Sequence, residues 1–230
     1  MPLLLITATK FEAKLLHQSL SFKAKAFTLG ELYCYKDKIF LAHLGIAKVN
    51  TAAGLAVLIK ELKPNKVIQF GIAGAYPNSG LAITEVVVAN TDMHIDTGVK
   101  TDDTWQDMQK MGFSLLVKDK SYYNIFPTNQ ALTNELSKLG LKSVSFASSE
   151  TVTGSHSDAL RIEQSLSVAV ESMEGAAAAQ VCLALDTAFA EIRAISNIVG
   201  QRDKSKWQIE QAIITLNKRI LEYLSHTEFK

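Results

Sequence analysis

Seven short segments rich in valine, isoleucine and leucine recur along the chain, and stretches with helical periodicity separate them. Such an alternation is typical of an α/β domain, in which helices cover a sheet. Because the segments are nearly continuous apolar runs, we expect strands that are buried on both faces. The predicted strands are Leu3–Thr7, Lys38–Leu44, Lys66–Gly71, Glu85–Asn90, Lys142–Ala147, Val168–Glu171 and Ala190–Ser196.

The helices between these strands are predicted from apolar spacing and end signals. Val49–Leu62 carries one apolar face. Thr128 is expected to cap a helix that runs to Leu139. Ser205 and Gln208 resemble a capping box, and the residues beyond it recur at helical spacing. The sequence therefore predicts helices in each of these three places.

The composition is that of an ordinary globular protein. The chain has 230 residues, of which 47% are hydrophobic and 20% charged, with a net charge of +1. This length suits a single domain over residues 1–230. The near-neutral charge gives no footprint for nucleic acid, and the longest apolar runs are too short for a membrane span or a signal peptide. Cys34 and Cys182 form no metal-type pair, so we expect reduced, buried thiols in a cytoplasmic protein.

The stretch Thr91–Asp107 is the most polar and least regular part of the chain. It is expected to form a long loop that could serve as a lid or an interface. Asp92, His94 and Asp96 alternate within it and could bind a metal. Alternating polar residues on a strand or loop are commoner, so no metal is expected.

Polar or glycine residues follow five of the predicted strands. In open α/β sheets, ligands bind in the crevice outside the carboxyl ends of the strands. We therefore expect one composite pocket to which all five segments contribute. These segments are Glu12, Gly71-Ile72-Ala73-Gly74, Ser148–Thr153, Met173-Glu174 and Ser196-Asn197.

Four of these side chains suggest chemistry on a nucleoside. Glu174 is either a first-turn acid favoured by the helix dipole or a carboxylate that accepts hydrogen bonds from two ribose hydroxyls. Met173 packs either on the sugar or in the core. Glu12 is either an exposed helical acid or a general base for water. The amide of Asn197 can donate to O6 of a 6-oxopurine and accept from a protonated N7. Together they indicate an enzyme that cuts an N-glycosidic bond to hypoxanthine.

The same segments resemble a known family over nearly the whole chain. They are similar to the nucleoside phosphorylase and nucleosidase superfamily, and the run around Asn197 narrows the resemblance to the futalosine hydrolase branch. The matching residues are Glu12, Leu44–Asn50, Gly71–Gly74, Ser172–Ala177, Arg193–Asp203 and Trp207.

This resemblance implies a three-layer α/β/α fold with a central mixed, largely parallel sheet. It also implies a homodimer that hydrolyses a small purine nucleoside without metal or cofactor. Futalosine would release hypoxanthine on an alternative route to menaquinone. Glu12 would activate water, Glu174 would bind the ribose and Asn197 would address purine N7. The base and ribose would be lined by Thr151, Val152, Thr153, Met173 and Ile72.

Alternatives remain open at this point. One alternative is a methylthioadenosine/S-adenosylhomocysteine nucleosidase with relaxed specificity. The adenine-releasing nucleosidases of the superfamily carry Asp where this chain has Asn197. A 6-oxopurine nucleoside phosphorylase and a catalytically inactive nucleoside-binding protein are the others. Trp207, with Arg202, Lys204 and Lys206 nearby, either binds an aromatic acid at the 5′ end of the substrate or forms a helix start with a solvated basic turn.

Overall fold

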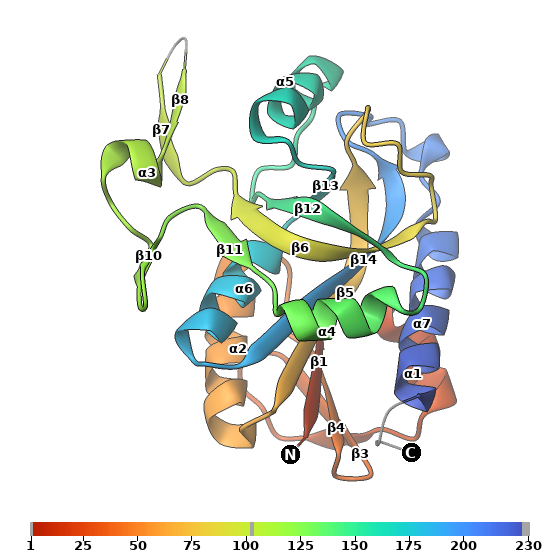
Figure 1. The fold of residues 1–230 in the computed structure, drawn as a ribbon. Helices are drawn as coiled ribbons and strands as arrows, with labels where there is room; N and C mark the ends of the chain where they lie inside the picture. Colours follow the sequence, from red (N-terminus) through yellow and green to blue (C-terminus); the bar gives the residue numbers. More distant parts are fainter. Residues whose placement is uncertain (1, 102–103, 227–230) are drawn as a thin grey trace.

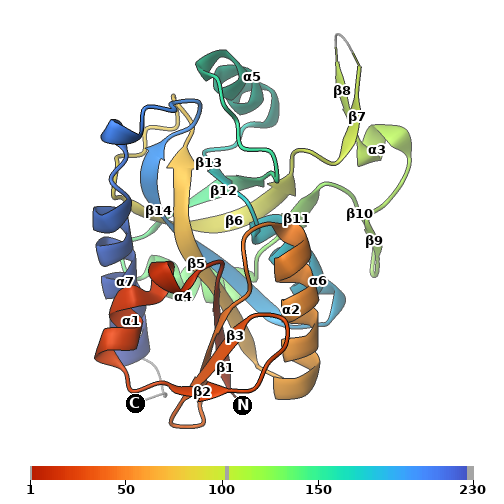
Figure 2. The same ribbon diagram turned by 180° about the vertical axis from the view of Figure 1, so that it is seen from behind.

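The computed structural model describes residues 2–101 and 104–226. In this part of the chain a ten-stranded mixed sheet carries helices on both faces (Figure 1 and Figure 2). In sheet order the strands are β11 (Ile125–Pro127), β6 (Val86–His94), β12 (Lys142–Ser148), β13 (Val170–Ser172), β5 (Lys66–Ala75), β1 (Leu3–Thr7), β4 (Ile39–His43), β3 (Glu31–Tyr35) and β2 (Lys23–Lys25), while β14 (Ala188–Ile198) pairs with both β5 and β6.

The sheet mixes parallel and antiparallel pairs. Strand β1 is parallel to β4 and β5, β5 is parallel to β14, and β12 is parallel to β6 and β13. Strands β2, β3 and β11 add antiparallel pairs, as do the contacts of β13 with β5 and of β14 with β6. Each of the seven predicted strands is present. Strand β5 runs four residues further than predicted, to Ala75, because Gly71 and Gly74 continue the strand and do not end it.

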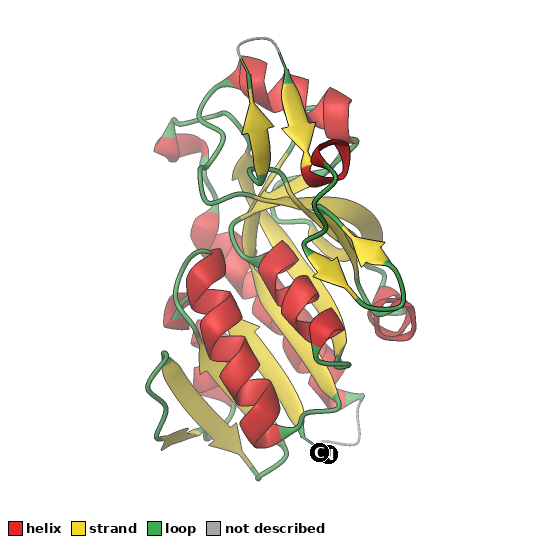
Figure 3. Ribbon diagram, turned by 90° about the vertical axis from the view of Figure 1, so that its left-hand side faces the viewer, coloured by secondary structure: helices red, strands yellow, loops and turns green. Residues whose placement is uncertain are grey.

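Alternate residues of β1 enter two different cores, which fixes the layers. Leu3 and Leu5 pack toward one face, where α1 (Lys14–Ser19), α4 (Gln130–Ser137) and α7 (Ile209–Ser225) supply apolar side chains. Leu4 and Ile6 pack toward the other face, against α2 (Lys48–Leu62) and α6 (Gly175–Ala184). The latter two helices lie side by side in front of the sheet in Figure 3. Complete burial of a Leu or Ile side chain stabilises the fold by about 1.5–3 kcal/mol.

Two predicted helix starts are wrong, one by a single residue and the other by three. Helix α4 is capped by Asn129, which accepts from Leu132 N, whereas Thr128 Oγ1 donates to the carbonyl of Ala89. The predicted capping box at Ser205 does not form, because Ser205 lies in the short 3-10 helix η2 (Lys204–Lys206), which Asp203 caps. Helix α7 begins after Gln208 without a side-chain cap.

The stretch Thr91–Asp107 is not the long loop that we expected. Strand β6 continues to His94, and β7 (Gly98–Lys100) pairs with β8 (Trp105–Asp107); residues 102–103 lie outside the described residues. Alternate residues at the end of β6 are buried, including Asp92 and His94, as in a strand with one buried face. The sequence did not predict this part of the strand because its buried residues are polar. The chain continues through α3 (Met108–Met111), β9 (Leu116–Val117) and β10 (Ser121–Tyr122), and α5 (His156–Leu166), which was not predicted, precedes β13.

Candidate functional site

A cavity of about 410 Å³ opens at the carboxyl ends of β1, β5, β13 and β14. The composite pocket expected from the strand ends is therefore present. Of the predicted site residues, Thr151 lies outside this lining, although it belongs to the same segment as two that contribute. The predicted residues in the lining are Glu12, Ile72, Val152, Thr153, Met173, Glu174, Asn197 and Trp207.

Glu12 is held rigidly at one wall of the cavity. It lies in the 3-10 helix η1 (Lys10–Ala13) directly after β1 and is 6% exposed. Its two oxygens accept from Thr9 N and Ile72 N, each at 3.0 Å. Burial raises the pKa of Glu12, Arg193 opposes this shift and Glu174 adds to it. A fixed carboxylate with raised basicity has the properties of a general base.

Glu174 faces the cavity from the start of α6. It occupies the N-cap position, yet its side chain accepts no hydrogen bond from that helix. Instead, Oε1 accepts from Ala47 N at 3.2 Å, and Oε2 accepts from Arg193 Nη2 at 3.0 Å. The first-turn acid interpretation therefore does not describe this carboxylate, which two other elements hold at the wall.

Arg193 is the cation that organises the acids of the site. It is 1% exposed in β14, and its Nε donates to Glu191 Oε1 at 2.7 Å. Burial alone would lower the pKa of Arg193, but the surrounding carboxylates raise it above the ordinary value. Its guanidinium therefore stays charged and fixes Glu174 in place.

Gly71 makes room for Glu12 and Arg193 to lie side by side. A Cβ atom at this position would lie 2.4 Å from Glu12 Oε1 and 2.5 Å from Arg193 Nη1. No carbon approaches an oxygen or nitrogen that closely without displacing it. Position 71 therefore requires a glycine, because Glu12 and Arg193 occupy the space that a side chain would need.

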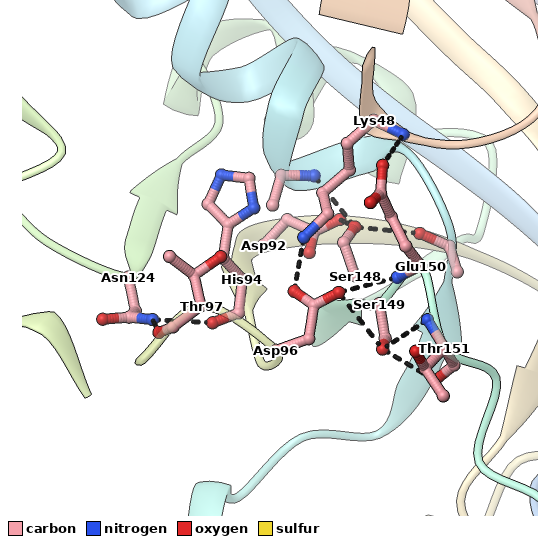
Figure 4. A network of polar contacts seen from close by, with 12 residues as sticks. Lys48, Asp92, His94, Asp96, Thr97, Asn124, Ser148, Ser149, Glu150 and Thr151 are labelled. Atoms are coloured by element: carbon pink, nitrogen blue, oxygen red, sulfur yellow. Dashed lines mark hydrogen bonds and ion pairs between the residues drawn. The ribbon is translucent and has the colours of Figure 1, made fainter. Parts of the chain in front are cut away.

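A second pair of acids lies behind Arg193. Asp92 and Glu191 are both fully buried, and a Cβ atom on Gly175 would meet Glu191 Oε2 at 1.9 Å and Asp92 Oδ2 at 2.2 Å. Burial raises the pKa of Asp92 well above its usual range, and the Glu191 carboxylate raises it further. Asp92 therefore keeps its proton to higher pH than an ordinary carboxyl. Ser148 Oγ donates to Asp92 Oδ2 at 3.1 Å (Figure 4).

Asn197 projects from a bulge in β14. The pairing with β5 shifts between Ile195 and Asn197, so Ser196 is an extra residue in the ladder. Bulges re-aim the side chain that follows them and are common beside active sites. The amide is steadied by Ser196 Oγ, which lies 2.8 Å from Asn197 Oδ1, and by Ile198 O, which accepts from Nδ2 at 3.1 Å.

The segment from Ser149 to Thr153 is anchored at its first half by a polar network (Figure 4). Glu150 N donates to Asp96 Oδ2 at 2.8 Å, and Asp96 also forms an ion pair with Lys48. Lys48 N in turn donates to Glu150 Oε1 at 3.1 Å. Ser149 Oγ donates to Thr151 O at 2.7 Å. These contacts fix the segment that was predicted to line the base.

Asp92 and His94 at the end of β6, and Asp96 just beyond it, have separate partners. Asp92 binds Ser148, and Asp96 binds Lys48 as described above. His94 Nε2 lies 3.0 Å from Gln180 Oε1, and burial lowers the pKa of His94 to about 4.

Trp207 and Arg202 line the same cavity at the start of η2 and α7. The Arg202 guanidinium lies 5.0 Å from the centre of the Trp207 ring, and Trp207 Nε1 donates to Gln201 O at 3.0 Å. Of the basic residues considered in the sequence, Arg202 is the one that reaches the lining. An aromatic ring and a cation thus meet in the lining of the cavity.

Three charged residues of the site were given no role in the sequence analysis: Glu171, Glu191 and Arg193. The available signal is that Glu191 and Arg193 interrupt an apolar strand two residues apart, which places them on one face. Buried charges in a strand are costly and therefore suggest a site.

The chain belongs to the phosphorylase superfamily, whose family model matches residues 2–225. Its sequence is 33% identical to a futalosine hydrolase of Thermus thermophilus over 225 residues, which are 96% of this chain and 95% of the relative. It is 31% identical to a 5′-methylthioadenosine/S-adenosylhomocysteine nucleosidase of Bacillus subtilis over 209 residues, covering 86% and 84% of the two chains. A structure of a futalosine hydrolase mutant of Helicobacter pylori superposes with a TM-score of 0.84 at 18% identity and covers 99% of this chain and 100% of the other, which supports the fold.

Proposed function

We propose that this protein hydrolyses the N-glycosidic bond of futalosine and releases hypoxanthine. The observation that carries the proposal is that two buried carboxylates, Glu12 and Glu174, and the amide of Asn197 line one cavity. The 33% identity to a futalosine hydrolase over 96% of the chain supports the substrate. The fold that carries this site would be a single three-layer α/β/α domain with a largely parallel central sheet.

In the proposed mechanism the bond between ribose C1′ and purine N9 breaks first, and its electron pair moves into the purine. Glu174 holds the ribose hydroxyls, and Asn197 hydrogen-bonds the leaving base while N7 takes a proton from water. Glu12 removes a proton from the attacking water, whose oxygen bonds to C1′, and this proton then returns to solvent, where it neutralises the hydroxide left when N7 was protonated. The products are hypoxanthine and the sugar with a hydroxyl at C1′. Positioning and electrostatics supply the rate.

Two replacements test these roles. Glu12→Gln removes the base, and Glu174→Ala removes the ribose contact. Each is expected to lower the rate of hypoxanthine release by at least about 100-fold, within the range for a lost base or positioning group. Normal rates in a folded variant would remove that residue from the mechanism.

The acidic wall favours water over phosphate as the nucleophile. Glu12 and Glu174 both face the cavity, and the charge of Arg193 is already shared between Glu174 and Glu191. A phosphate anion would meet two carboxylates there. We therefore expect hydrolysis that does not depend on inorganic phosphate. The decisive experiment is chromatography of the free bases released from futalosine, inosine and methylthioadenosine, with and without phosphate.

We also propose a homodimer. Val49, Phe113 and Val117 are apolar, and they are 73%, 63% and 70% exposed. They lie on α2 and on the segment from α3 to β9, where exposed apolar groups indicate an interface. Light scattering of Val117→Asp against the unchanged chain tests this surface, and equal masses would contradict it.

A further inference from the structure

Two buried acids behind the cavity, Asp92 and Glu191, have no part in the mechanism above. Both are 0% exposed, and neither belongs to the lining of the cavity. Glu191 Oε2 and Asp92 Oδ2 lie 1.9 Å and 2.2 Å from the point that a Cβ atom on Gly175 would occupy, so the two oxygens are at most about 4.1 Å apart. Two buried carboxyls at this separation cannot both be ionised, because like charges repel strongly in a protein interior. The pair therefore holds a proton.

The geometry places this proton on Asp92. Glu191 Oε1 accepts from Arg193 Nε at 2.7 Å, and this cation favours the negative charge on Glu191. Within residues 2–101 and 104–226 no N–H or O–H group donates to the buried Glu191 Oε2. A carboxylic acid can donate a hydrogen bond, whereas a carboxylate only accepts. A proton on Asp92 thus supplies the donor that Glu191 Oε2 needs, while Asp92 Oδ2 still accepts from Ser148 Oγ at 3.1 Å.

Arg193 connects this pair of acids to Glu174. Its Nη2 donates to Glu174 Oε2 at 3.0 Å, and its Nη1 donates to Ile72 O at 3.3 Å. The guanidinium is planar and rigid, so the contact of Nε with Glu191 helps to set the direction in which Nη2 points. The side chains of Arg193, Glu191 and Glu174 are at most 5% exposed, so solvent screens these contacts little. A shift of Glu191 is therefore transmitted to Glu174.

We propose that Asp92 and Glu191 share one proton and, through Arg193, orient the Glu174 carboxylate toward the ribose hydroxyls. The inference rests on the proposed function, in which Glu174 binds these hydroxyls. Asp92 and Glu191 do not touch the substrate, so both are positioning residues. Without the donor on Asp92, Glu191 Oε2 is buried without a partner, which is costly, and Glu191 shifts together with Arg193. Loss of the donor then weakens recognition of the ribose and leaves every group of the cavity in place.

The experiment compares futalosine with its 3′-deoxy analogue, which lacks one ribose hydroxyl. This hydroxyl is remote from the bond that breaks, so the ratio of kcat/KM for futalosine to that for the analogue measures the hydroxyl contact. In the unchanged chain the ratio is expected to be at least about tenfold, as for a hydrogen bond to a charged group. Asp92→Leu has the shape of aspartate but no donor, and the ratio is expected to fall by at least about fivefold.

Asp92→Asn is the conservative variant that should restore the ratio. Its amide keeps an N–H donor toward Glu191, and Ser148 Oγ can then donate to Ser172 Oγ, which lies 3.2 Å away. The ratio is expected to stay within about twofold of that for the unchanged chain. An Asp92→Asn variant with a ratio as low as that of Asp92→Leu would overturn the inference.

Leu136→Ala is the matched control for lost stability. Leu136 is 0% exposed in α4 and belongs to the core that contains Ile192 of β14. Successive residues of a strand point to opposite faces, so this core lies on the other side of β14 from Glu191. The midpoint of urea unfolding should fall, whereas the ratio should stay within about twofold. The inference is overturned if Asp92→Leu leaves the ratio unchanged, or if Leu136→Ala lowers it equally.

The shared proton has a spectroscopic signature that needs no activity. A protonated carboxyl group has a C=O stretching band in the infrared spectrum that a carboxylate lacks. At neutral pH the difference spectrum between the unchanged chain and Asp92→Asn should contain this band. Its absence overturns the inference, and this measurement decides the question if Asp92→Leu does not fold.

Failure of the proposed function is a separate result. If the unchanged chain releases no hypoxanthine from futalosine, that function is refuted. Calorimetric titration with inosine and with 3′-deoxyinosine then replaces the kinetic ratio. A preference for inosine that disappears in Asp92→Leu but remains in Asp92→Asn supports the inference. Equal preferences in all three proteins, or no preference in the unchanged chain, overturn it.

Discussion

Replacement of Gly71 by alanine should disable the site through one added atom. The new Cβ would lie 2.4 Å from Glu12 Oε1 and 2.5 Å from Arg193 Nη1. A tolerable contact is about 3.0–3.4 Å, so each group must move by roughly 0.6–1 Å, because the interior is close-packed and cannot absorb the atom elsewhere. A misplacement of about 1 Å can cost about 100-fold in rate. Overpacking should also lower the free energy of unfolding by about 1–3 kcal/mol.

The assay is the steady-state rate of hypoxanthine release, measured together with the thermal unfolding temperature. Gly154→Ala is the matched control, since a Cβ at that position meets nothing within 4 Å. We expect kcat of Gly71→Ala to fall by about 100-fold while Gly154→Ala stays near the unchanged chain. If the two variants have similar rates, Glu12 and Arg193 are not held in the geometry on which the mechanism depends.

Further predictions concern base choice, pH and the 5′ end. Asn197→Asp should shift the preference toward 6-aminopurine nucleosides by about 10- to 100-fold, measured as a ratio of kcat/KM, because a mispaired buried group costs about 1–3 kcal/mol; an unchanged ratio would contradict the role of the amide. Because Glu12 must be ionised to act as a base and its pKa is raised above 4.5, the acid limb of the pH profile of kcat/KM should have its midpoint above that value. The pKa of Asp92 is higher in the folded state than its unfolded value of 3.8. The stability that protonated Asp92 gives the fold is therefore complete below pH 3.8 and is lost as the pH rises through the folded-state pKa. The free energy of unfolding, measured with urea, should therefore fall by up to about 1.4 kcal/mol per pH unit between pH 3.8 and the folded-state pKa. Asp92→Asn should reduce this dependence on pH. Trp207→Ala should raise KM for futalosine but not for inosine, which lacks the aromatic acid; equal KM values for futalosine in both proteins would refute the contact.

The centre of the fold could be predicted from the sequence because its strands are apolar runs with clear ends. Strand β1 matches its prediction at both ends, and β12 differs by one residue. The edges could not be predicted in this way. Strand β2 is exposed at all three residues, and α5 buries one residue, Ala159, so neither shows a strong apolar pattern. The β7–β8 hairpin was hidden by the same polar composition.

The cavity could be predicted because its residues follow strand ends, where the parallel part of the sheet brings them together. Glu12, Glu174 and Asn197 were found in this way. Glu171, Glu191 and Arg193 lie inside strands, and only the tertiary pairing shows that their charges meet. The balance among these charges depends on distances of a few ångströms, which sequence spacing does not encode.

The bulge at Ser196 affects how this enzyme could acquire new substrates. Because the extra residue resets the alternation of β14, the side chain at Asn197 is uncoupled from the core packing of the residues before it. If Asn197 has the role proposed above, a mutation there would exchange one leaving-group preference for another without disturbing the interior. The irregularity thus separates a position that is free to vary from a scaffold that is not, so new specificities can arise at little cost to foldability.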